Sequence, residues 1–225
     1  MYYNYDWDKY VEVDTKSTGR TYKIPNIGKY PSITTILGKT ANQMWLQIWR
    51  ENVGDEEADR ISKEATDRGS LVHDYLERFW NEEDITTNLS KEKPDVRLMT
   101  NNLIKATKKG KMKVYGQERV VYSKELKYAG RVDVIGEWEG QPAIIDYKTA
   151  RKTKYAKYIK DYYIQCAAYA QAHNEIYGSN ISKLVILITV EDKDVQVFKA
   201  NLIHHLPDLK YRLKSYYKKV EQENG

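Results

Sequence analysis

The period at which apolar residues recur changes midway along the chain, and this change restricts the fold more than any other feature of the sequence. Apolar residues return at helical spacing from Gln43 to Asn52 and from Asp55 to Trp80, and residues 88–110 continue the helical pattern. From Val114 onward the chain instead alternates and is rich in Val, Ile and Tyr, with a turn signal at Gly140. This second pattern predicts a strand, a hairpin and a third strand, so a helical half precedes a β-meander.

Three further segments follow the meander. Residues 161–178 are expected to form a helix that ends at Gly178, residues 183–190 a strongly apolar strand, and residues 195–200 a shorter strand. Helices and strands in this order favour an α/β fold in which a mixed central β-sheet is flanked by helices. The helical half then forms an N-terminal helical region beside that sheet.

No repeat, low-complexity tract or proline-rich linker divides the chain, so we expect a single domain over residues 1–225. Residues 21–36 are expected to hold a short strand and a turn, with Ser32 opening a further segment. The domain is expected to contain a helical region that roofs the functional site, an αβ core and a basic C-terminal helix, at about 41–110, about 114–200 and about 204–222.

Composition limits the kind of site and partner. The 37 Lys and Arg residues outnumber the 32 Asp and Glu residues, and the net charge of +5 permits a polyanionic partner without requiring one. Cys166 is the single cysteine, which excludes an intrachain disulfide framework and an all-cysteine zinc or iron–sulfur site. The opening sequence MYYNYDWDKY lacks the pattern of a signal peptide, and no apolar run approaches the length of a membrane span. We therefore expect a soluble intracellular protein.

An apolar run, AII, leads directly into the polar sequence Asp146-Tyr147-Lys148. Charges at the end of a buried strand are costly unless they are solvated, paired or bound to a metal ion. In an extended chain Asp146 and Lys148 share one face. The triplets at Asp14 and Asp208 have the same form, but only the one at Asp146 follows an apolar strand. A structural alternative is a surface ion pair between Asp146 and Lys148, worth about 0–1 kcal/mol.

A second acid, Asp133, lies in the preceding strand within GRVDVIG. Antiparallel neighbours bring residues on one face within about 5 Å, so Asp133 and Asp146 could share a divalent cation. Carboxylate oxygens are ligands that Mg²⁺ and Mn²⁺ prefer. Lys148 beside such an ion could orient or help to deprotonate a water molecule and offset charge on a phosphate. This chemistry is suited to cutting a phosphodiester.

Four motifs in order, RGSLVHDYLERF, GRVDVIG, AIIDYKTA and YIQCAAYAQAH, resemble the PD-(D/E)XK nuclease superfamily and specifically its RecB-type exonuclease branch. Within that branch the chain is similar to phage exonucleases and to the exonucleases of mitochondrial genome maintenance. The resemblance implies a restriction-endonuclease-like core and Mg²⁺ or Mn²⁺ as the cofactor, in one or two ions and without an iron–sulfur cluster. It implies catalytic roles for Asp133, Asp146, Lys148, Gln165 and Tyr169.

The same resemblance implies metal ligation by His73, Asp133, Asp146 and the carbonyl group of Tyr147. His73 lies four residues after Gly69, so both are expected on one helical face, where a small residue lets the helix approach the sheet. Glu77 could be an outer partner of the site. Glu118 could belong to the site or be a solvated residue at the end of a strand. The sequence does not decide whether either glutamate belongs to the site.

Basic residues and tyrosines are concentrated directly after the Asp-x-Lys triplet. This segment is where we expect a nucleic-acid backbone to enter, with rings available for stacking on bases. A solvated face is the alternative for these residues and for the basic C-terminal helix. The expected DNA-binding residues are Thr149, Arg151, Lys152, Lys154 and Tyr155.

The function that these features predict is a metal-dependent DNA exonuclease that hydrolyses phosphodiester bonds from single-stranded or duplex ends, in recombination, repair or replication. The alternatives are a structure-specific endonuclease of the same fold and a catalytically idle DNA-binding accessory protein of recombination. The expected location is the cytoplasm of a bacterium or of a phage-infected cell, without membrane association. The sequence has no Gly-x-x-x-x-Gly-Lys-Ser/Thr motif, so a motor that unwinds DNA would be a separate polypeptide. The expected protein partners are a separate recombinase, helicase or single-strand-binding protein.

Overall fold

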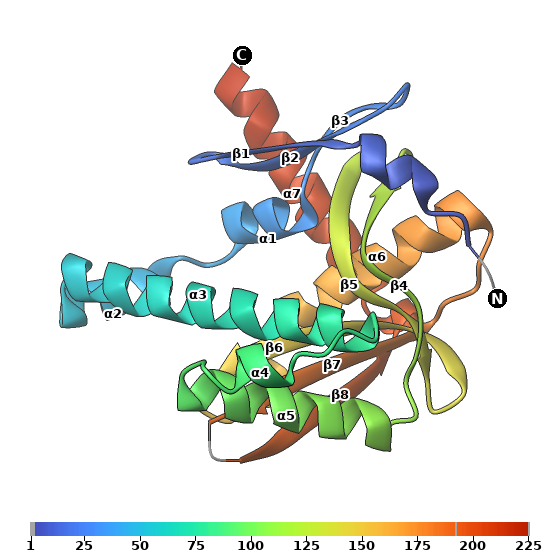
Figure 1. The fold of residues 1–225 in the computed structure, drawn as a ribbon. Helices are drawn as coiled ribbons and strands as arrows, with labels where there is room; N and C mark the ends of the chain where they lie inside the picture. The colour runs from blue at the N-terminus through green and yellow to red at the C-terminus, as the bar shows by residue number, and fades with distance from the viewer. Residues whose placement is uncertain (1–2, 192, 225) are drawn as a thin grey trace.

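A five-stranded β-sheet forms the centre of the protein (Figure 1). The computed structural model describes residues 3–191 and 193–224. The first three strands pair antiparallel, the third and fourth pair parallel, and the fourth and fifth pair antiparallel, so the predicted mixed sheet is confirmed. In spatial order the strands are β4 (Lys113–Ser123), β5 (Tyr128–Trp138), β6 (Gln141–Ala150), β7 (Lys183–Val190) and β8 (Lys193–Asn201).

Helices cover both faces of this sheet, as predicted. One face carries α1 (Ile33–Thr40), α6 (Lys160–Tyr177) and α7 (Leu206–Asn224). The other carries α3 (Asp55–Trp80), α4 (Thr86–Leu89) and α5 (Pro94–Lys109). Among the described residues, no helix is both long and apolar enough to cross a lipid bilayer.

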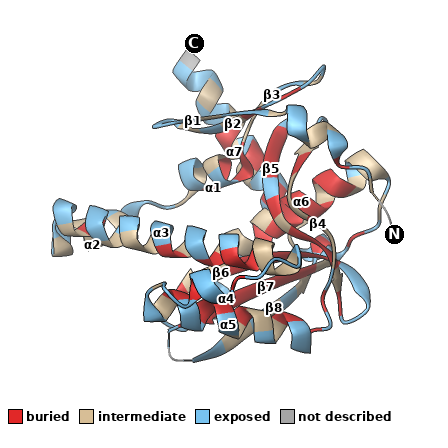
Figure 2. Ribbon diagram, in the orientation of Figure 1, coloured by how far each residue is buried: buried red, intermediate tan, exposed pale blue. Residues whose placement is uncertain are grey.

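Successive side chains of β6 and β7 point to opposite faces of the sheet, and this divides the interior into two hydrophobic clusters. Ile144 and Ile186 pack toward α6, whereas Ile145 and Val185 pack toward α3 and α5. Because β7 is covered on both faces, its apolar run is continuous, and burial of each such side chain contributes roughly 1.5–3 kcal/mol. Figure 2 shows the buried residues gathered where the helices meet the sheet.

A second sheet of three antiparallel strands lies at the N-terminal side, after the 3-10 helix η1 (Asp6–Tyr10). Its strands are β1 (Glu12–Lys16), β2 (Gly19–Ile24) and β3 (Gly28–Pro31). The sequence predicted only one short strand and a turn here. The β1 strand was missed because it pairs on one side only and has no buried residue, so it has no apolar alternation. Ser32 caps α1 as expected, because its hydroxyl oxygen accepts a hydrogen bond from the Thr35 amide at 3.0 Å.

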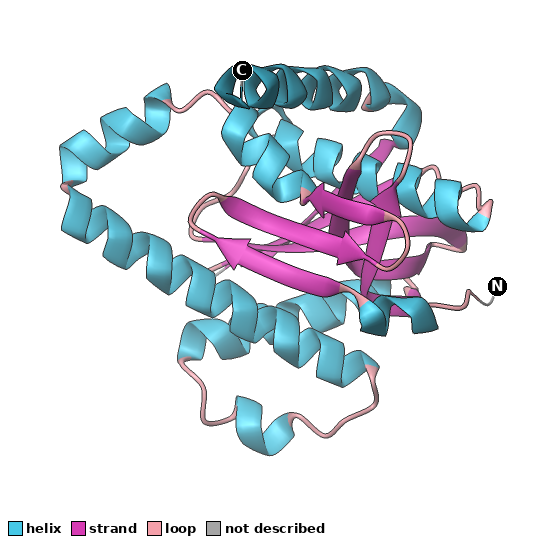
Figure 3. Cartoon of the chain, turned by 90° about the horizontal axis from the view of Figure 1, so that it is seen from above, coloured by secondary structure: helices cyan, strands magenta, loops and turns pink. Residues whose placement is uncertain are grey.

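Helix α2 (Met44–Val53) and the first half of α3 extend away from the sheet as a helical arm (Figures 1 and 3). None of the α2 residues is buried, and the Trp45 side chain is 69% exposed. The body of the sheet is covered instead by the second half of α3, which carries His73. Helix α2, which holds Trp45 and Trp49, lies out on the arm, and a roof over the functional site formed by residues 41–110 stays a prediction.

His173 on α6 is fully buried beneath the N-terminal segment. Its Nε2 atom lies 3.1 Å from the Tyr5 hydroxyl, and its Nδ1 atom lies 2.7 Å from the Ser179 hydroxyl. The Tyr3 and Tyr177 rings pack against the imidazole at centroid distances of 4.6 and 4.7 Å. Burial disfavours the imidazolium form and lowers the pKa of His173 to about 4.

We expect His173 to make the fold sensitive to acid. The folded imidazole stays neutral down to about pH 4, whereas the unfolded one takes up a proton near pH 6.5. The contribution of His173 to the free energy of unfolding is therefore complete above pH 6.5 and is lost as the pH falls toward 4, by roughly 2–3 kcal/mol. Urea unfolding at pH 7 and pH 4.5 should show a smaller loss for His173→Gln than for the wild type. His204 is exposed, so His204→Gln should lose as much stability as the wild type. Equal losses of stability in all three proteins would show that His173 is not the source of the acid sensitivity.

Candidate active site

Strands β5 and β6 separate at Asp133 and Asp146. Their last paired residues are Val134 and Ile145, after which β5 continues beside β4 and β6 continues beside β7. The Tyr147 amide donates a hydrogen bond of 2.8 Å to Asp133 Oδ2 across the opening. Asp133 and Asp146 therefore lie where the sheet splits and the strand edges need polar partners.

Asp146 and Lys148 form a buried ion pair rather than a surface pair. Lys148 Nζ lies 2.5 Å from Asp146 Oδ2, and the two side chains are 21% and 1% exposed. Gln165 on α6 donates a hydrogen bond of 3.1 Å to Asp146 Oδ1 and lies 3.0 Å from the Tyr169 hydroxyl. The Tyr162 ring lies under the Lys148 ammonium at 5.2 Å. The pair is thus held in one orientation by α6.

Charge and burial compete at this pair. Burial raises the pKa of Asp146 to about 6, the Lys148 ammonium opposes the shift, and Asp133 adds to it. Burial alone would lower the pKa of Lys148, but the Asp146 and Asp133 carboxylates outweigh burial and hold that pKa above its ordinary value. Lys148 is therefore a cation at neutral pH in this arrangement.

His73 reaches the opening from α3. Its Nε2 atom lies 3.0 Å from the carbonyl oxygen of Tyr147, and its Nδ1 atom lies 3.7 Å from Asp133 Oδ2. A carbonyl oxygen only accepts hydrogen bonds, so the Nε2 atom must carry a proton. In the neutral ring the Nδ1 lone pair then faces Asp133, which is the orientation that a metal ligand needs. The Tyr147 carbonyl, predicted as a metal ligand, accepts the bond that fixes His73.

Glu118 completes a cluster that the sequence left open. Gln117 and Arg119 pair with Val134 and Val132, which places Glu118 opposite Asp133 on β4. Glu118 has a left-handed backbone with φ 50°, unusual for a residue other than glycine. Ligand atoms of His73, Glu118 and Asp133 all lie within 4.8 Å of one another.

The metal-ligand cluster formed by His73, Glu118 and Asp133 fits a divalent cation. Burial, then the charges of Asp133 and Glu77, raise the pKa of Glu118 to about 8. Crowded carboxylates of this kind are stabilised when a cation is placed between them. Asp146 was predicted as a ligand of the same ion, but in this structure its oxygens are engaged by Lys148 and Gln165.

A cavity of about 510 Å³ opens over the cluster. Its walls come from α3, from β4 and β5, from α6 and from the N-terminal sheet, and they include His73, Glu118, Asp133, Gln165, Tyr169 and Arg20. Arg131, two residues before Asp133 on β5, also lines it. Neither Arg20 nor Arg131 was predicted from the sequence as a site residue. The spacing of Arg131 from Asp133 was a usable signal, whereas nothing in the sequence places Arg20 here.

Gly130 leaves the space that the Tyr169 ring occupies. A Cβ atom at Gly130 would lie 2.5 Å from Tyr169 Cε1 and 3.3 Å from Ile33 Cγ2. At Gly69, by contrast, a Cβ atom would meet only Thr149 Oγ1, at an ordinary 3.5 Å. Close approach therefore explains Gly130 better than Gly69.

We expect Gly130→Ala to destabilise the fold and disturb the site, whereas Gly69→Ala should be tolerated. The new methyl group must displace the Tyr169 ring, at a cost of about 1–3 kcal/mol, and with it the partner of Gln165. Thermal unfolding of the two variants measures the difference. Equal melting temperatures for Gly130→Ala and the wild type would show that Tyr169 moves freely.

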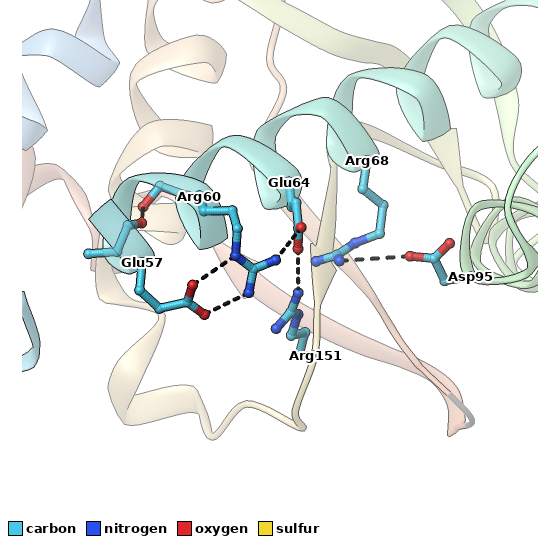
Figure 4. A network of polar contacts seen from close by, with 8 residues as sticks. Glu57, Arg60, Glu64, Arg68, Asp95 and Arg151 are labelled. Carbon is cyan, nitrogen blue, oxygen red and sulfur yellow. Dashed lines mark hydrogen bonds and ion pairs between the residues drawn. The ribbon is translucent and has the colours of Figure 1, made fainter. Parts of the chain in front are cut away.

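The predicted DNA-binding segment leaves β6 beside α3. Arg151 Nη2 donates to Glu64 Oε2 at 3.1 Å, next to the contacts of Arg60 with Glu57 and Glu64 (Figure 4). The same view shows the contact of Arg68 with Asp95, which joins α3 to α5. The Arg68 Nη1 atom lies 3.9 Å from Asp95 Oδ2. Arg151 thus already has a carboxylate partner, and a DNA phosphate would have to compete with Glu64 for it.

The other members of this segment are placed differently. Lys152 and Tyr155 are exposed, and the Tyr155 ring packs edge-on to Tyr158 at 6.3 Å. The backbone of Lys154 is held at both its amide and carbonyl groups by the Gln196 side chain on β8. The hydroxyl of Thr149 faces α3 at Gly69. DNA binding by these residues stays a prediction.

Curated proteins similar to this chain are named as exonucleases. Mitochondrial genome maintenance exonuclease 1 of Xenopus tropicalis is 27% identical over 215 residues, covering 87% of this chain and 60% of the relative. The human protein of the same name is 26% identical over 175 residues, covering 72% of this chain and 49% of the relative. The chain therefore spans about half to three fifths of the length of these relatives.

Two solved structures are similar at low identity. A candidate exonuclease from Eubacterium rectale matches with a TM-score of 0.45 and 12% identity, over 67% of this chain and 66% of the other. An alkaline exonuclease from Laribacter hongkongensis matches with a TM-score of 0.38 and 9% identity, over 56% of this chain and 66% of the other.

The sequence profile of one family matches nearly all of the region described above. The match covers residues 46–223, from the helical arm to the last helix, and includes every residue of the metal-ligand cluster and the Asp146–Lys148 pair. The chain belongs to the PD-(D/E)XK nuclease superfamily.

Proposed function

We propose that the protein is a metal-dependent DNA exonuclease. The observation that carries the proposal is the convergence, at the split between β5 and β6, of the buried Asp146–Lys148 pair with the metal-ligand cluster. This arrangement contributes little to stability, because the desolvation cost of a buried ion pair often exceeds its attraction. It is suited to catalysis, and the superfamily to which the chain belongs is one of nucleases.

His73, Glu118 and Asp133 are the residues that would hold Mg²⁺ or Mn²⁺. The two carboxylates are ligands that either ion prefers, and the neutral imidazole adds one nitrogen ligand. A divalent cation bound there supplies Lewis acidity and a charge that offsets the negative phosphodiester. Asp146 lies beside the cluster and would extend it toward Lys148.

Lys148 acts in this proposal as a fixed cation. Asp146, which is itself held by Gln165, and the Tyr162 ring keep its ammonium group in place, and its raised pKa keeps it charged. It would bind a non-bridging phosphate oxygen and stabilise charge that builds up as water attacks phosphorus. In the overall reaction the water oxygen bonds to phosphorus, the bond to a sugar oxygen breaks, one proton leaves the water and one joins the sugar oxygen.

Action at DNA ends is proposed from the names of the relatives, because the fold itself serves both exonucleases and endonucleases. A structure-specific endonuclease remains the alternative enzyme. A catalytically idle DNA-binding accessory protein is disfavoured by the intact Asp146–Lys148 pair. The cellular location, and a separate recombinase, helicase or single-strand-binding partner, stay predictions from the sequence.

The test compares end-labelled single strands, blunt duplexes and covalently closed circles, each with Mg²⁺ or Mn²⁺. The proposal predicts that linear DNA is degraded and circles are not, with no cleavage in EDTA. Cutting of circles would support the endonuclease instead. Binding without cutting of any substrate would support the accessory protein.

A further inference from the structure

A second cavity continues the active-site cavity past Glu118. It has a volume of about 570 Å³ and shares three lining residues with the first: Glu77, Glu118 and Arg131. From there it extends along β4 to Gln117 and along the end of α3 to Trp80 and Asn81. Its volume is within the roughly 300–1,000 Å³ of sites that bind small molecules. We refer to it as the Gln117 cavity.

Arg131 is a cation between the two cavities whose guanidinium is available to a ligand. It is exposed, and within residues 3–191 and 193–224 no side-chain hydrogen bond or close ion pair engages its guanidinium, although its charge lowers the pKa of neighbouring Glu118. The second arginine of the Gln117 cavity, Arg119, is engaged by Asp8 at 3.4 Å and by the Tyr5 ring at 5.5 Å. A guanidinium without a hydrogen-bond partner beside an acidic cluster is suited to bind a phosphate that the carboxylates would otherwise repel.

The wall of the Gln117 cavity offers an acceptor and a donor side by side. Gln117 Nε2 donates to Asn81 Oδ1 at 3.0 Å and to the Glu77 carbonyl at 3.3 Å. Gln117 Oε1 and Asn81 Nδ2 then have no hydrogen-bond partner in the part of the chain that the structure describes. An acceptor next to a donor can bond the edge of a nucleobase, and Trp80 adds an aromatic ring to the wall.

The spacing of Arg131 from the cluster matches a nucleotide strand. Arg131 and Asp133 are two residues apart on β5, about 7 Å along the strand, a step similar to that between successive phosphates of an extended single strand. We propose that the Gln117 cavity binds the nucleotide next to the phosphate that is cut, with Arg131 on its phosphate and the Gln117–Asn81 pair on its base. This inference rests on the proposed function, and the ligand class is a nucleoside monophosphate or a terminal nucleotide of DNA.

Binding of thymidine 5′-monophosphate and thymidine 3′-monophosphate, each measured by calorimetry with Ca²⁺ present, tests the cavity without turnover. Loss of one charge-assisted phosphate contact should weaken binding of at least one of them roughly tenfold in Arg131→Ala. Arg131→Lys should recover part of the affinity. Exposed Arg97→Ala on α5 is the matched control and should bind as the wild type does. No binding by the wild type, or equal binding by Arg131→Ala, would overturn the inference.

DNA cleavage by the same variants separates this inference from the proposed function. Arg131→Ala should raise KM more than it lowers kcat and should change the lengths of the released products, while its melting temperature stays that of the wild type. Cleavage by the wild type with an unchanged Arg131→Ala variant would refute the inference alone. A wild type that binds thymidine monophosphate through Arg131 but cuts no DNA would refute the proposed function and support the nucleotide site.

Discussion

Asp146→Asn and Lys148→Ala are each expected to lower the rate of DNA cleavage by about 10³-fold or more, while DNA is still bound. Asp146→Asn removes the carboxylate that holds Lys148 at 2.5 Å, and Lys148→Ala removes the fixed cation itself. Loss of one preorganised group that stabilises charge in the transition state typically costs about 10²–10³-fold, and loss of the pair's shared geometry adds to it. Single-turnover cleavage with Mg²⁺ and fluorescence anisotropy with Ca²⁺ measure the two properties separately.

The chain contains a matched control for this experiment. Asp208 and Lys210 have the same spacing in the same kind of triplet, but they lie exposed on α7. Asp208→Asn and Lys210→Ala should cleave DNA at the wild-type rate. Melting temperatures show whether each variant is folded, because an unpaired charge buried at the site can also destabilise the protein. A folded Asp146→Asn variant with wild-type cleavage would refute the site.

Glu118→Gln is expected to weaken Mn²⁺ binding at least about tenfold, since it removes one of the charged ligands of the cluster. It should also change how stability depends on pH. The folded carboxyl keeps its proton up to about pH 8, whereas the unfolded one loses it near pH 4.5. The contribution of Glu118 to the free energy of unfolding is therefore complete below pH 4.5 and is lost as the pH rises toward 8. Without metal, the glutamine variant should lack this loss.

Glu77→Gln is the control for Glu118→Gln, and the pair of variants tests which glutamate belongs to the site. Glu77 lines the same cavity but lies outside the metal-ligand cluster. We expect it to bind Mn²⁺ as the wild type does in titrations followed by electron paramagnetic resonance. Weaker binding in Glu77→Gln together with normal binding in Glu118→Gln would show that the cluster is assigned to the wrong glutamate.

The sequence predicted the parts of the fold that depend on periodicity. The alternation from Val114 onward predicts β4 to β6, and the helical spacing from Asp55 to Trp80 predicts α3. The pairing of β5 with β6 ends at Val134 and Ile145, the neighbours of Asp133 and Asp146, and a cation shared by these two acids stays a prediction. These features were accessible because burial imposes a period on the sequence.

Features set by backbone irregularity or by contacts between distant elements were not accessible. The left-handed conformation that presents Glu118 to the cluster leaves no mark in the sequence, because glutamate rarely adopts it. The ion pair of Arg151 with Glu64 joins residues far apart in the chain, so the basic segment looked free when one of its arginines was already paired. Strand β1 has no buried side chain to reveal it.

A divalent cation is expected to bind between His73, Glu118 and Asp133, next to Lys148. The first experiment we would make measures anomalous scattering from crystals of Lys148→Ala grown with Mn²⁺ and a short DNA strand. We expect an anomalous peak in contact with these three side chains and a DNA phosphate beside the peak. A peak at another place on the protein, with none at this cluster, would refute the proposed metal site.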